Sequence, residues 1–166
     1  QRFDAAGAAV GTEFKVNAYT SSNQDTSQVA TFADGSFVVV WQSYGQDGNG
    51  YGIYGQRYTA AGVVSGTEFQ INTFTSNDQA EAQVEALAGG GFVVTWTSYN
   101  QDGSSYGVYA QRYNADGSAA GTEFRINEST AGGQYQSSVT ALANGGFVVS
   151  WYNDNYDSSG TGRFSS

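Results

Sequence analysis

The chain has 166 residues, of which 39% are hydrophobic and 15% aromatic, and this is enough apolar surface for a sizeable core. Fifteen acids against six bases give a formal net charge of -9, which argues against nucleic acid and anionic membrane surfaces as partners. The absence of Cys excludes disulfides and thiolate metal sites, the absence of His removes the commonest general base, and no apolar run reaches the ~20 residues that membrane insertion requires.

The predicted elements are strands throughout the chain. Residues 1–17 begin with the end of one strand and continue into another, Glu13 to Asn17. The stretch "QVATFADGSFVVVW" (28–41) then predicts two strands around an Asp34-Gly35 turn, because that pair adopts positive φ readily. "YGIYGQRY" (51–58) predicts a third strand and "GTEFQIN" (66–72) a fourth. No stretch has the apolar spacing of a helix.

The same pattern of strands then returns twice. "GTEF" occurs at 11–14, 66–69 and 121–124, and the tryptophans are Trp41, Trp96 and Trp151, so the period is 55 residues. The sequence therefore divides into the repeats 1–55, 56–110 and 111–165. In the second copy a two-residue turn would place Glu85 opposite Val94 on an apolar face, which predicts a longer or bulged turn.

The predicted fold class is all-β, with three tandem four-stranded antiparallel repeats that resemble β-propeller blades. A β-trefoil or β-prism with pseudo-threefold symmetry is the alternative. Three blades are too few to close a propeller, so the chain is expected to belong to a larger ring or to form a homo-oligomer of two chains with six blades. The strand at Glu13 to Asn17 is predicted to complete the sheet that begins with Val139 to Trp151, which leaves no edge unpaired.

The stretches "ADGSFVVVWQSYGQDGNGYGIYGQRY" and "GTEFQIN" resemble the tandem arrays of very large secreted bacterial proteins, of the adhesin-like and hemolysin-type calcium-binding class. The resemblance implies an extracellular or cell-surface location and a structural or adhesive role. From the three repeats and the need to close a ring, residues 1–166 are expected to form one repeat domain, as a fragment or self-associating piece of a larger array.

Two sets of repeated residues have structural interpretations. Each tryptophan ends a nearly continuous apolar strand, which predicts that all three lie in the core. An arginine precedes a glutamate by eleven residues in every copy, across a predicted hairpin, which indicates cross-strand ion pairs. The pairs are Arg2 with Glu13, Arg57 with Glu68, and Arg112 with Glu123.

The loop "YGQDGNGY" and its second copy form the candidate binding site, because tyrosine beside Gly, Ser and Asn is typical of recognition surfaces. Its predicted ligand-binding residues are Tyr44, Gln46, Asp47, Tyr51, Tyr99, Gln101, Asp102 and Tyr106. A carbohydrate or a cell-surface protein is the predicted partner. Calcium is the one candidate cofactor, with Asp47, Asp102 and Asp157 as its ligands, although one Asp per loop is sparse for six to eight oxygens.

The sequence predicts a repeat module without enzymatic activity. No His is present to activate a serine, and the acids Asp154 and Asp157 lie in the degraded third copy. A glycan-binding lectin that uses the tyrosine loops and a calcium-stabilised scaffold are the two alternative functions.

Overall fold

The structure is a computed structural model that describes residues 1–154 and 163–165. All its regular elements are β-strands, and the described residues contain no helix. The strands are β1 Arg2–Phe3, β2 Ala9–Val10, β3 Gln24–Thr31, β4 Phe37–Tyr44, β5 Tyr51–Tyr58, β6 Val64–Gln70, β7 Gln79–Ala86, β8 Phe92–Tyr99, β9 Tyr106–Tyr113, β10 Phe124–Arg125, β11 Gln134–Ala141, β12 Phe147–Asn153 and β13 Arg163–Ser165. The described part of the chain accordingly has no helix long and apolar enough to cross a membrane.

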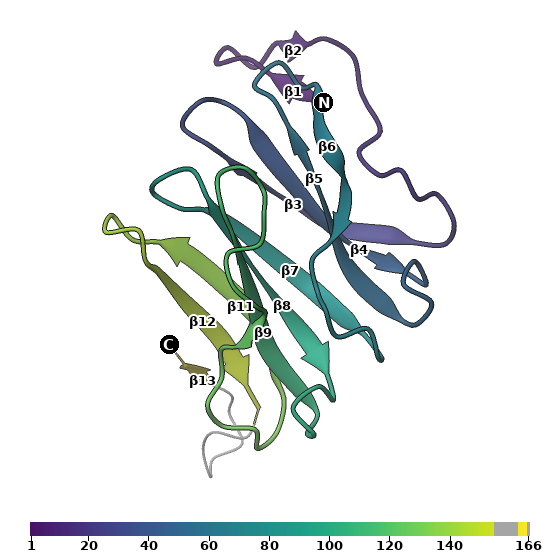
Figure 1. The fold of residues 1–166 in the computed structure, drawn as a ribbon, viewed down its shortest axis with the longest axis vertical. Coiled ribbons are helices and arrows are strands. Elements are labelled where there is room, and N and C mark those ends of the chain that lie inside the picture. Colours follow the sequence, from purple (N-terminus) through teal and green to yellow (C-terminus); the bar gives the residue numbers. More distant parts are fainter. Residues whose placement is uncertain (155–162, 166) are drawn as a thin grey trace.

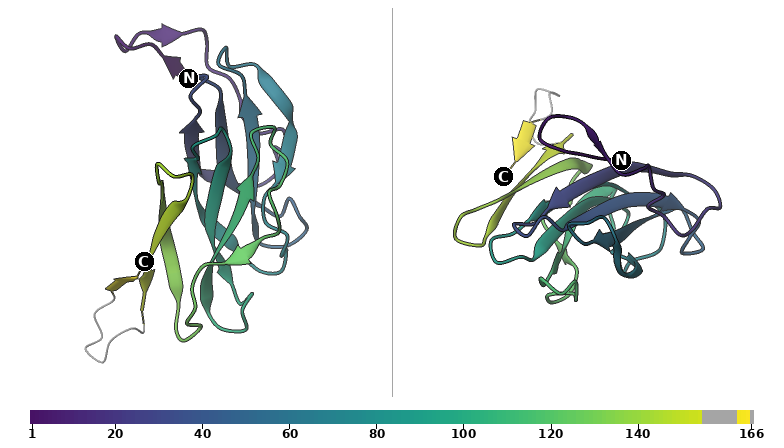
Figure 2. Two further views of the ribbon diagram at one scale, coloured as in Figure 1. Left: turned by 60° about the vertical axis from the view of Figure 1, so that its left-hand side comes forward. Right: turned by 90° about the horizontal axis from the view of Figure 1, so that it is seen from above.

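The strands form three main antiparallel sheets, each with its strands in chain order (Figure 1). Sheet 1 contains β3 to β6, sheet 2 contains β7 to β10, and sheet 3 contains β11 to β13. The first strands of the sheets lie beside one another, with β3 against β7 and β7 against β11. Figure 2 shows the sheets as neighbouring layers, with the separate β1–β2 hairpin beside sheet 1. The prediction of an all-β fold is thus confirmed, and two of the sheets have the predicted four antiparallel strands, whereas sheet 3 has three strands among the described residues.

The predicted repeat boundaries fall inside strands rather than between sheets. The boundary 55/56 cuts β5, and the boundary 110/111 cuts β9. The first hairpin of sheet 2 has the longer turn that its sequence predicts. Ala86 pairs with Phe92 and Glu85 with Val93, while the Leu87 N–H donates to the Gly91 carbonyl at 2.8 Å.

The apolar core is made by the faces that neighbouring sheets turn towards each other. Between sheets 1 and 2, Val38 and Val40 pack with Val94 and Trp96 in one cluster. The three tryptophans are 3%, 0% and 9% exposed at positions 41, 96 and 151. Their predicted place in the core is confirmed, because nearly continuous apolar strands are covered on both faces.

The predicted fourth strand is only partly correct. It forms fully in sheet 1, where β6 pairs with β5, but sheet 2 keeps only the short β10. Residues 13–17 are not a strand and do not complete sheet 3. They lie against sheet 1, where Phe14 contacts Tyr58 with ring centroids 5.3 Å apart, because the apolar face of Val39 and Trp41 needs cover.

The predicted Arg–Glu ion pairs do not form among the described residues, and Arg57, Glu68 and Glu123 bind other partners instead. The Arg57 guanidinium donates to the carbonyls of Ala115 and Asp116, in the turn that follows β9 of sheet 2. Glu68 accepts the Ala18 N–H at 2.6 Å, and Glu123 accepts the Thr73 N–H at 2.6 Å. The bonds of Arg57 and Glu123 connect sheet 1 and its following segment with sheet 2, and the bond of Glu68 ties sheet 1 to the segment before β3, so the partners are about one repeat away in sequence.

A buried amide network also joins successive sheets. Asn72, which follows β6, accepts the Ile53 N–H at 2.7 Å and donates to Gln79 Oε1 at 3.0 Å. The Asn–Gln bond recurs at 3.0 Å between Asn127 and Gln134. Gln79 is fully buried and opens β7, so the network fixes the start of one sheet to the end of the previous one.

Alkaline pH is expected to destabilise the fold through its buried tyrosines. Burial raises the pKa of Tyr54 to about 12, and that of Tyr109 to about 12, with the Asp47 and Asp102 carboxylates adding to the respective shifts. Because the folded pKa lies above the unfolded value of 10, stability is intact below pH 10 and falls as pH rises towards 12. Each group contributes a loss of up to about 1.4 kcal/mol per pH unit.

The measurement is the thermal midpoint, followed by circular dichroism from pH 9 upwards. Tyr54→Phe and Tyr109→Phe should each reduce the slope above pH 10, because phenylalanine does not ionise. A midpoint that stays constant through this window would contradict the prediction.

Candidate functional site

Exposed and half-buried tyrosines form a row at one end of the sheets. Tyr44 and Tyr51 are opposite each other across β4 and β5, with ring centroids 5.1 Å apart, and Tyr99 faces Tyr106 across β8 and β9 at 5.0 Å. The second pair continues into sheet 3. Its further ring contacts are Tyr106 with Tyr135 at 6.0 Å and Tyr135 with Tyr152 at 5.0 Å.

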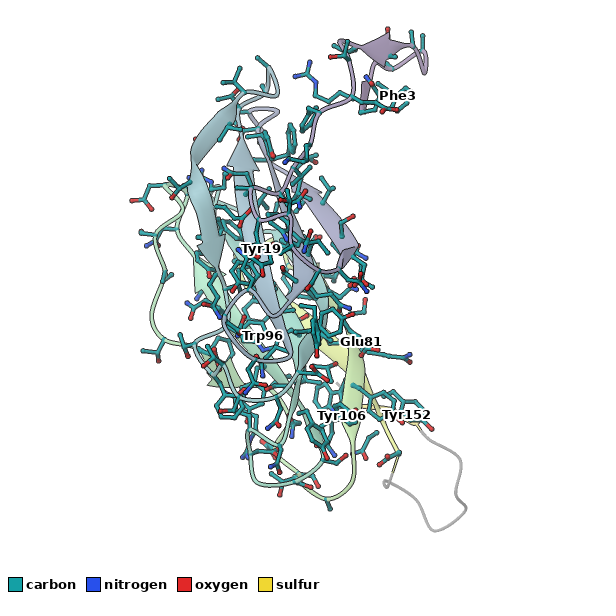
Figure 3. The ribbon with its side chains drawn as sticks, turned by 90° about the vertical axis from the view of Figure 1, so that its right-hand side faces the viewer. Phe3, Tyr19, Glu81, Trp96, Tyr106 and Tyr152 are labelled. Atoms are coloured by element: carbon teal, nitrogen blue, oxygen red, sulfur yellow. The ribbon has the colours of Figure 1, made fainter. Side chains whose placement is uncertain are left out.

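A cleft of about 430 Å³ opens beside this row and is bounded by all three sheets. We call it the tyrosine cleft, and its lining residues are Thr26, Gln42, Tyr51, Asp78, Ala80, Glu81, Thr97, Tyr106 and Tyr135. In Figure 3, Tyr106 and Tyr152 lie at the end of the molecule far from the β1–β2 hairpin that carries Phe3, and Glu81 lies nearer the middle. The cleft thus joins an aromatic rim to a carboxylate at its inner side.

Glu81 is held in the cleft by a β-bulge at the start of β7. The pairing shifts register between Ala80 and Gln83, and Glu81 has a φ of 57°. The same bulge occurs in β3 and β11, where Thr26 and Gln136 have φ values of 49° and 54°. Positive φ is strained for residues with a side chain, and such positions cluster at functional sites.

The contacts of Glu81 fix one oxygen and leave the other available. Its Oε2 accepts the Thr97 hydroxyl at 3.0 Å and the Gln136 N–H at 3.1 Å, while its own N–H donates to Gln42 Oε1. Its Oε1 has no hydrogen bond to the described residues. The carboxylate is therefore oriented by two sheets and can still accept a hydrogen bond from a ligand.

Tyr135 is a neutral hydroxyl in the same cleft. Burial raises its pKa, and the carboxylate of Asp154, the Tyr152 hydroxyl and the carboxylate of Glu81 raise it further. The hydroxyl stays protonated at neutral pH, so it can donate as well as accept a hydrogen bond.

Among the predicted loop residues, the tyrosines form the row. The amides and acids instead bind other residues of their own sheet or loop. Gln46 and Gln101 donate to Glu68 and Glu123 in the same sheets. Asp47 Oδ1 accepts the Asn49 N–H at 3.1 Å, a turn that aspartate commonly makes with its own backbone.

The carboxylates of Asp47 and Asp102 are turned inward, against the strand that follows each loop. A Cβ on Gly52 would lie 2.8 Å from Asp47 Oδ2, so only glycine lets the carboxylate approach there. The Asp102 side chain is 1% exposed and lies 4.0 Å from the Arg125 guanidinium. Within the described residues, no three acidic side chains gather as a metal site, and Asp157 lies outside those residues. Calcium binding stays a prediction.

Sequence reasoning missed the residues that give the cleft its polar character, namely Asp78, Glu81 and Tyr135. Each differs from its counterparts one repeat away: Glu81 corresponds to Thr26 and Gln136, and Tyr135 to Asp25 and Ala80. The sequence feature that could have identified these residues is that they differ from the corresponding residues of the other repeats, in or just before the first strand of a sheet.

No protein-family model and no curated protein matches the chain. Its fold is similar to three solved structures. An endo-arabinase from Bacteroides thetaiotaomicron VPI-5482 is 14% identical with a TM-score of 0.54, over 86% of this chain and 54% of that one. An endo-1,4-beta-xylanase from the same organism is 11% identical with a TM-score of 0.54, over 93% and 62%. An alpha-L-arabinofuranosidase from Lactobacillus brevis is 13% identical with a TM-score of 0.56, over 94% and 59%.

These likenesses correct the prediction that the chain has no enzymatic activity. That prediction rested on the absence of His and on the place of Asp154 and Asp157 in the degraded third copy, but glycoside hydrolysis requires only carboxyl groups, and all three similar structures are glycoside hydrolases. At 11–14% identity the likeness establishes the fold alone. The chain spans between 54% and 62% of the length of these solved structures.

Proposed function

We propose that this chain binds a neutral carbohydrate in the tyrosine cleft. The observation that carries the proposal is the meeting of Tyr51, Tyr106 and Tyr135, one from each sheet, around a cleft that also contains Glu81. Sugars offer flat apolar faces edged by hydroxyls, and aromatic rings beside hydrogen-bonding groups complement both. The fold likeness to an arabinase, a xylanase and an arabinofuranosidase supports a carbohydrate ligand.

We infer that the sheets are arranged like propeller blades. Each sheet packs its face on the next, and the first strands β3, β7 and β11 lie together, as the inner strands of blades do. This arrangement is favoured over a trefoil or prism because the apolar clusters lie between successive sheets. In this arrangement the tyrosine cleft lies where the inner strands meet. The extracellular location and the adhesin-like array stay predictions.

The charge of the cleft selects the class of sugar. Asp78 and Glu81 both line it, and the chain carries a net charge of -9. Carboxylates accept hydrogen bonds from sugar hydroxyls and repel uronates and sulfated sugars. Neutral pentose oligosaccharides of arabinose or xylose are therefore the first probes to test.

Neutral oligosaccharides are expected to bind saturably in isothermal titration calorimetry, and Tyr106→Ala should weaken the affinity at least ~10-fold, about 1.4 kcal/mol. Tyr106→Phe retains the ring and should change the affinity by less than ~3-fold, because stacking supplies most of the contact. Phe3→Ala is the matched control, since Phe3 is an aromatic residue, 63% exposed, on the distant β1–β2 hairpin.

The same mixtures should be assayed for new reducing ends. Release of sugar by the wild-type chain that Glu81→Gln abolishes would make the cleft catalytic, and intact oligosaccharides would leave it a binding site. Equal affinity of the wild type and Tyr106→Ala, or preference for an anionic oligosaccharide, would contradict the proposal.

A further inference from the structure

The outer face of sheet 3 exposes apolar residues whose counterparts are buried in the other sheets. Val148 is 44% exposed, whereas the equivalent Val38 and Val93 are both 0% exposed. Leu142 is 40% exposed and its counterpart Leu87 only 7%. In sheets 1 and 2 the following sheet covers these positions. We call this surface of sheet 3 the trailing face.

The outer face of sheet 1, on the opposite side of the stack, also exposes residues whose counterparts in the other sheets are covered. Val29 is 58% exposed, whereas the equivalent Val84 and Val139 pack against the sheet before them. Ser27 is exposed, whereas its counterpart Ala82 is 1% exposed. A cavity of about 280 Å³ lies on this face and is lined in part by Ser27, Val39 and Trp41. We call this surface the leading face.

The leading face also has an extended segment that is not a strand and has no strand partner among the described residues. Residues 13–17 are one repeat before residues 68–72, and both segments lay apolar side chains on the following sheet. β6 pairs with β5, but residues 13–17 pair with no strand among the described residues. A sheet that docked on the leading face would meet an open backbone edge as well as apolar side chains, and such edges favour pairing with another chain.

We propose that two copies of this chain associate head to tail, with the trailing face of each on the leading face of the other. A second copy is the expected partner because the same two kinds of face already pack together within the chain. They meet between sheets 1 and 2 and again between sheets 2 and 3. The number of copies follows from the requirement that the blades close into a ring. Propellers contain about four to eight blades, and six is the only multiple of three in that range. The proposal rests on the blade arrangement given above, and sugar binding is not part of it.

The net charge of -9 on each copy opposes this association, so added salt should strengthen it by screening. Sedimentation velocity of the whole chain over a concentration series, at low and high salt, is the test. The expected result is a shift from the mass of one chain, 17.5 kDa, to twice that mass.

Val148→Asp and Val29→Asp should each weaken dimerisation at least ~10-fold, because each places a carboxylate in both interfaces of the ring. Val63→Asp is the matched control, since Val63 is 62% exposed in the turn before β6 and belongs to neither face. Circular dichroism melts check that these exposed substitutions leave the monomer folded.

Mixing the two variants distinguishes head-to-tail association from association through like faces. A heterodimer of Val148→Asp with Val29→Asp keeps one interface without a substitution, so the mixture should dimerise more strongly than either variant alone. Loss of dimer with Val148→Asp but not with Val29→Asp would indicate like faces in contact and overturn the proposal. A wild type that stays monomeric at every concentration and salt, or that forms species growing beyond two chains, would overturn it as well.

Discussion

Replacing Trp96 by alanine is expected to lower the free energy of unfolding by about 3–5 kcal/mol. Its side chain is 0% exposed and belongs to the cluster that joins sheets 1 and 2, with Val40, Ile71 and Tyr109. Alanine would leave a cavity between two packed sheets, and neighbouring side chains recover only part of the lost contact. Denaturant unfolding followed by circular dichroism measures the effect.

Trp96→Phe separates the loss of packing from the loss of the indole N–H. That N–H is buried without a hydrogen-bond partner among the described residues, so its removal relieves a desolvation cost. The phenylalanine variant should therefore lose less than about 2 kcal/mol. Trp41→Ala is the comparison within the repeat, and it should cost less than Trp96→Ala, because Trp41 lines the open cavity on the leading face. Equal losses for Trp96→Ala and Trp96→Phe would contradict this account.

Asn72→Ala is expected to cost about 2–5 kcal/mol, because it leaves several buried polar groups unpaired at about 1–3 kcal/mol each. The Ile53 N–H and Gln79 Oε1 both lose their partner, and both residues are 0% exposed. Asn72→Asp retains an acceptor for the Ile53 N–H but places a carboxylate beside Gln79 Oε1. It should therefore be at least as unstable as the alanine variant.

Asn17→Ala is the matched control for this network. Asn17 makes the same bond to the following glutamine, Gln24, at 3.0 Å, but it is only half-buried. Water can replace the lost partner there, so its substitution should cost less than about 1 kcal/mol. The free energies come from the same denaturant titrations. A loss at position 17 as large as that at position 72 would show that burial is not the cause.

The 55-residue period predicted the fold well, because core strands repeat their apolar residues. The buried positions of Val38, Val93 and the tryptophans follow directly from that pattern. The fourth strand was overpredicted, because residues 13–17 have the composition of a strand but no third strand to pair with. Strand composition gives the tendency, and pairing requires a neighbour.

The Arg–Glu pairs failed for a related reason. A separation of eleven residues across a predicted hairpin indicated a local contact, yet Arg57 binds carbonyls in the turn that follows β9 of the next sheet. A tandem array offers every side chain equivalent partners within its own copy and in the next copy. Sequence periodicity cannot distinguish these partners, because it is the same for both.

The candidate site was predicted in its tyrosines and missed in its polar residues. Tyr51 and Tyr106 occur in both complete loops, so a search for shared features finds them. Glu81 and Tyr135 are each present in one repeat and replaced by other residues in the other two, and the cleft forms only where three sheets meet. Only the three-dimensional arrangement of the sheets places these unique residues beside the repeated ones.

The bulges at Thr26, Glu81 and Gln136 have a consequence for how such a scaffold can diversify. Their side chains leave the regular alternation of the strand, and Thr26 and Gln136 are exposed. Thr26 lines the tyrosine cleft and the Gln136 N–H donates to Glu81, so substitutions of these two exposed side chains change the surroundings of Glu81 without removing apolar residues from between the sheets. One architecture can thus acquire different ligand preferences through exposed side chains at the bulges, while the folding information stays in the strands around them.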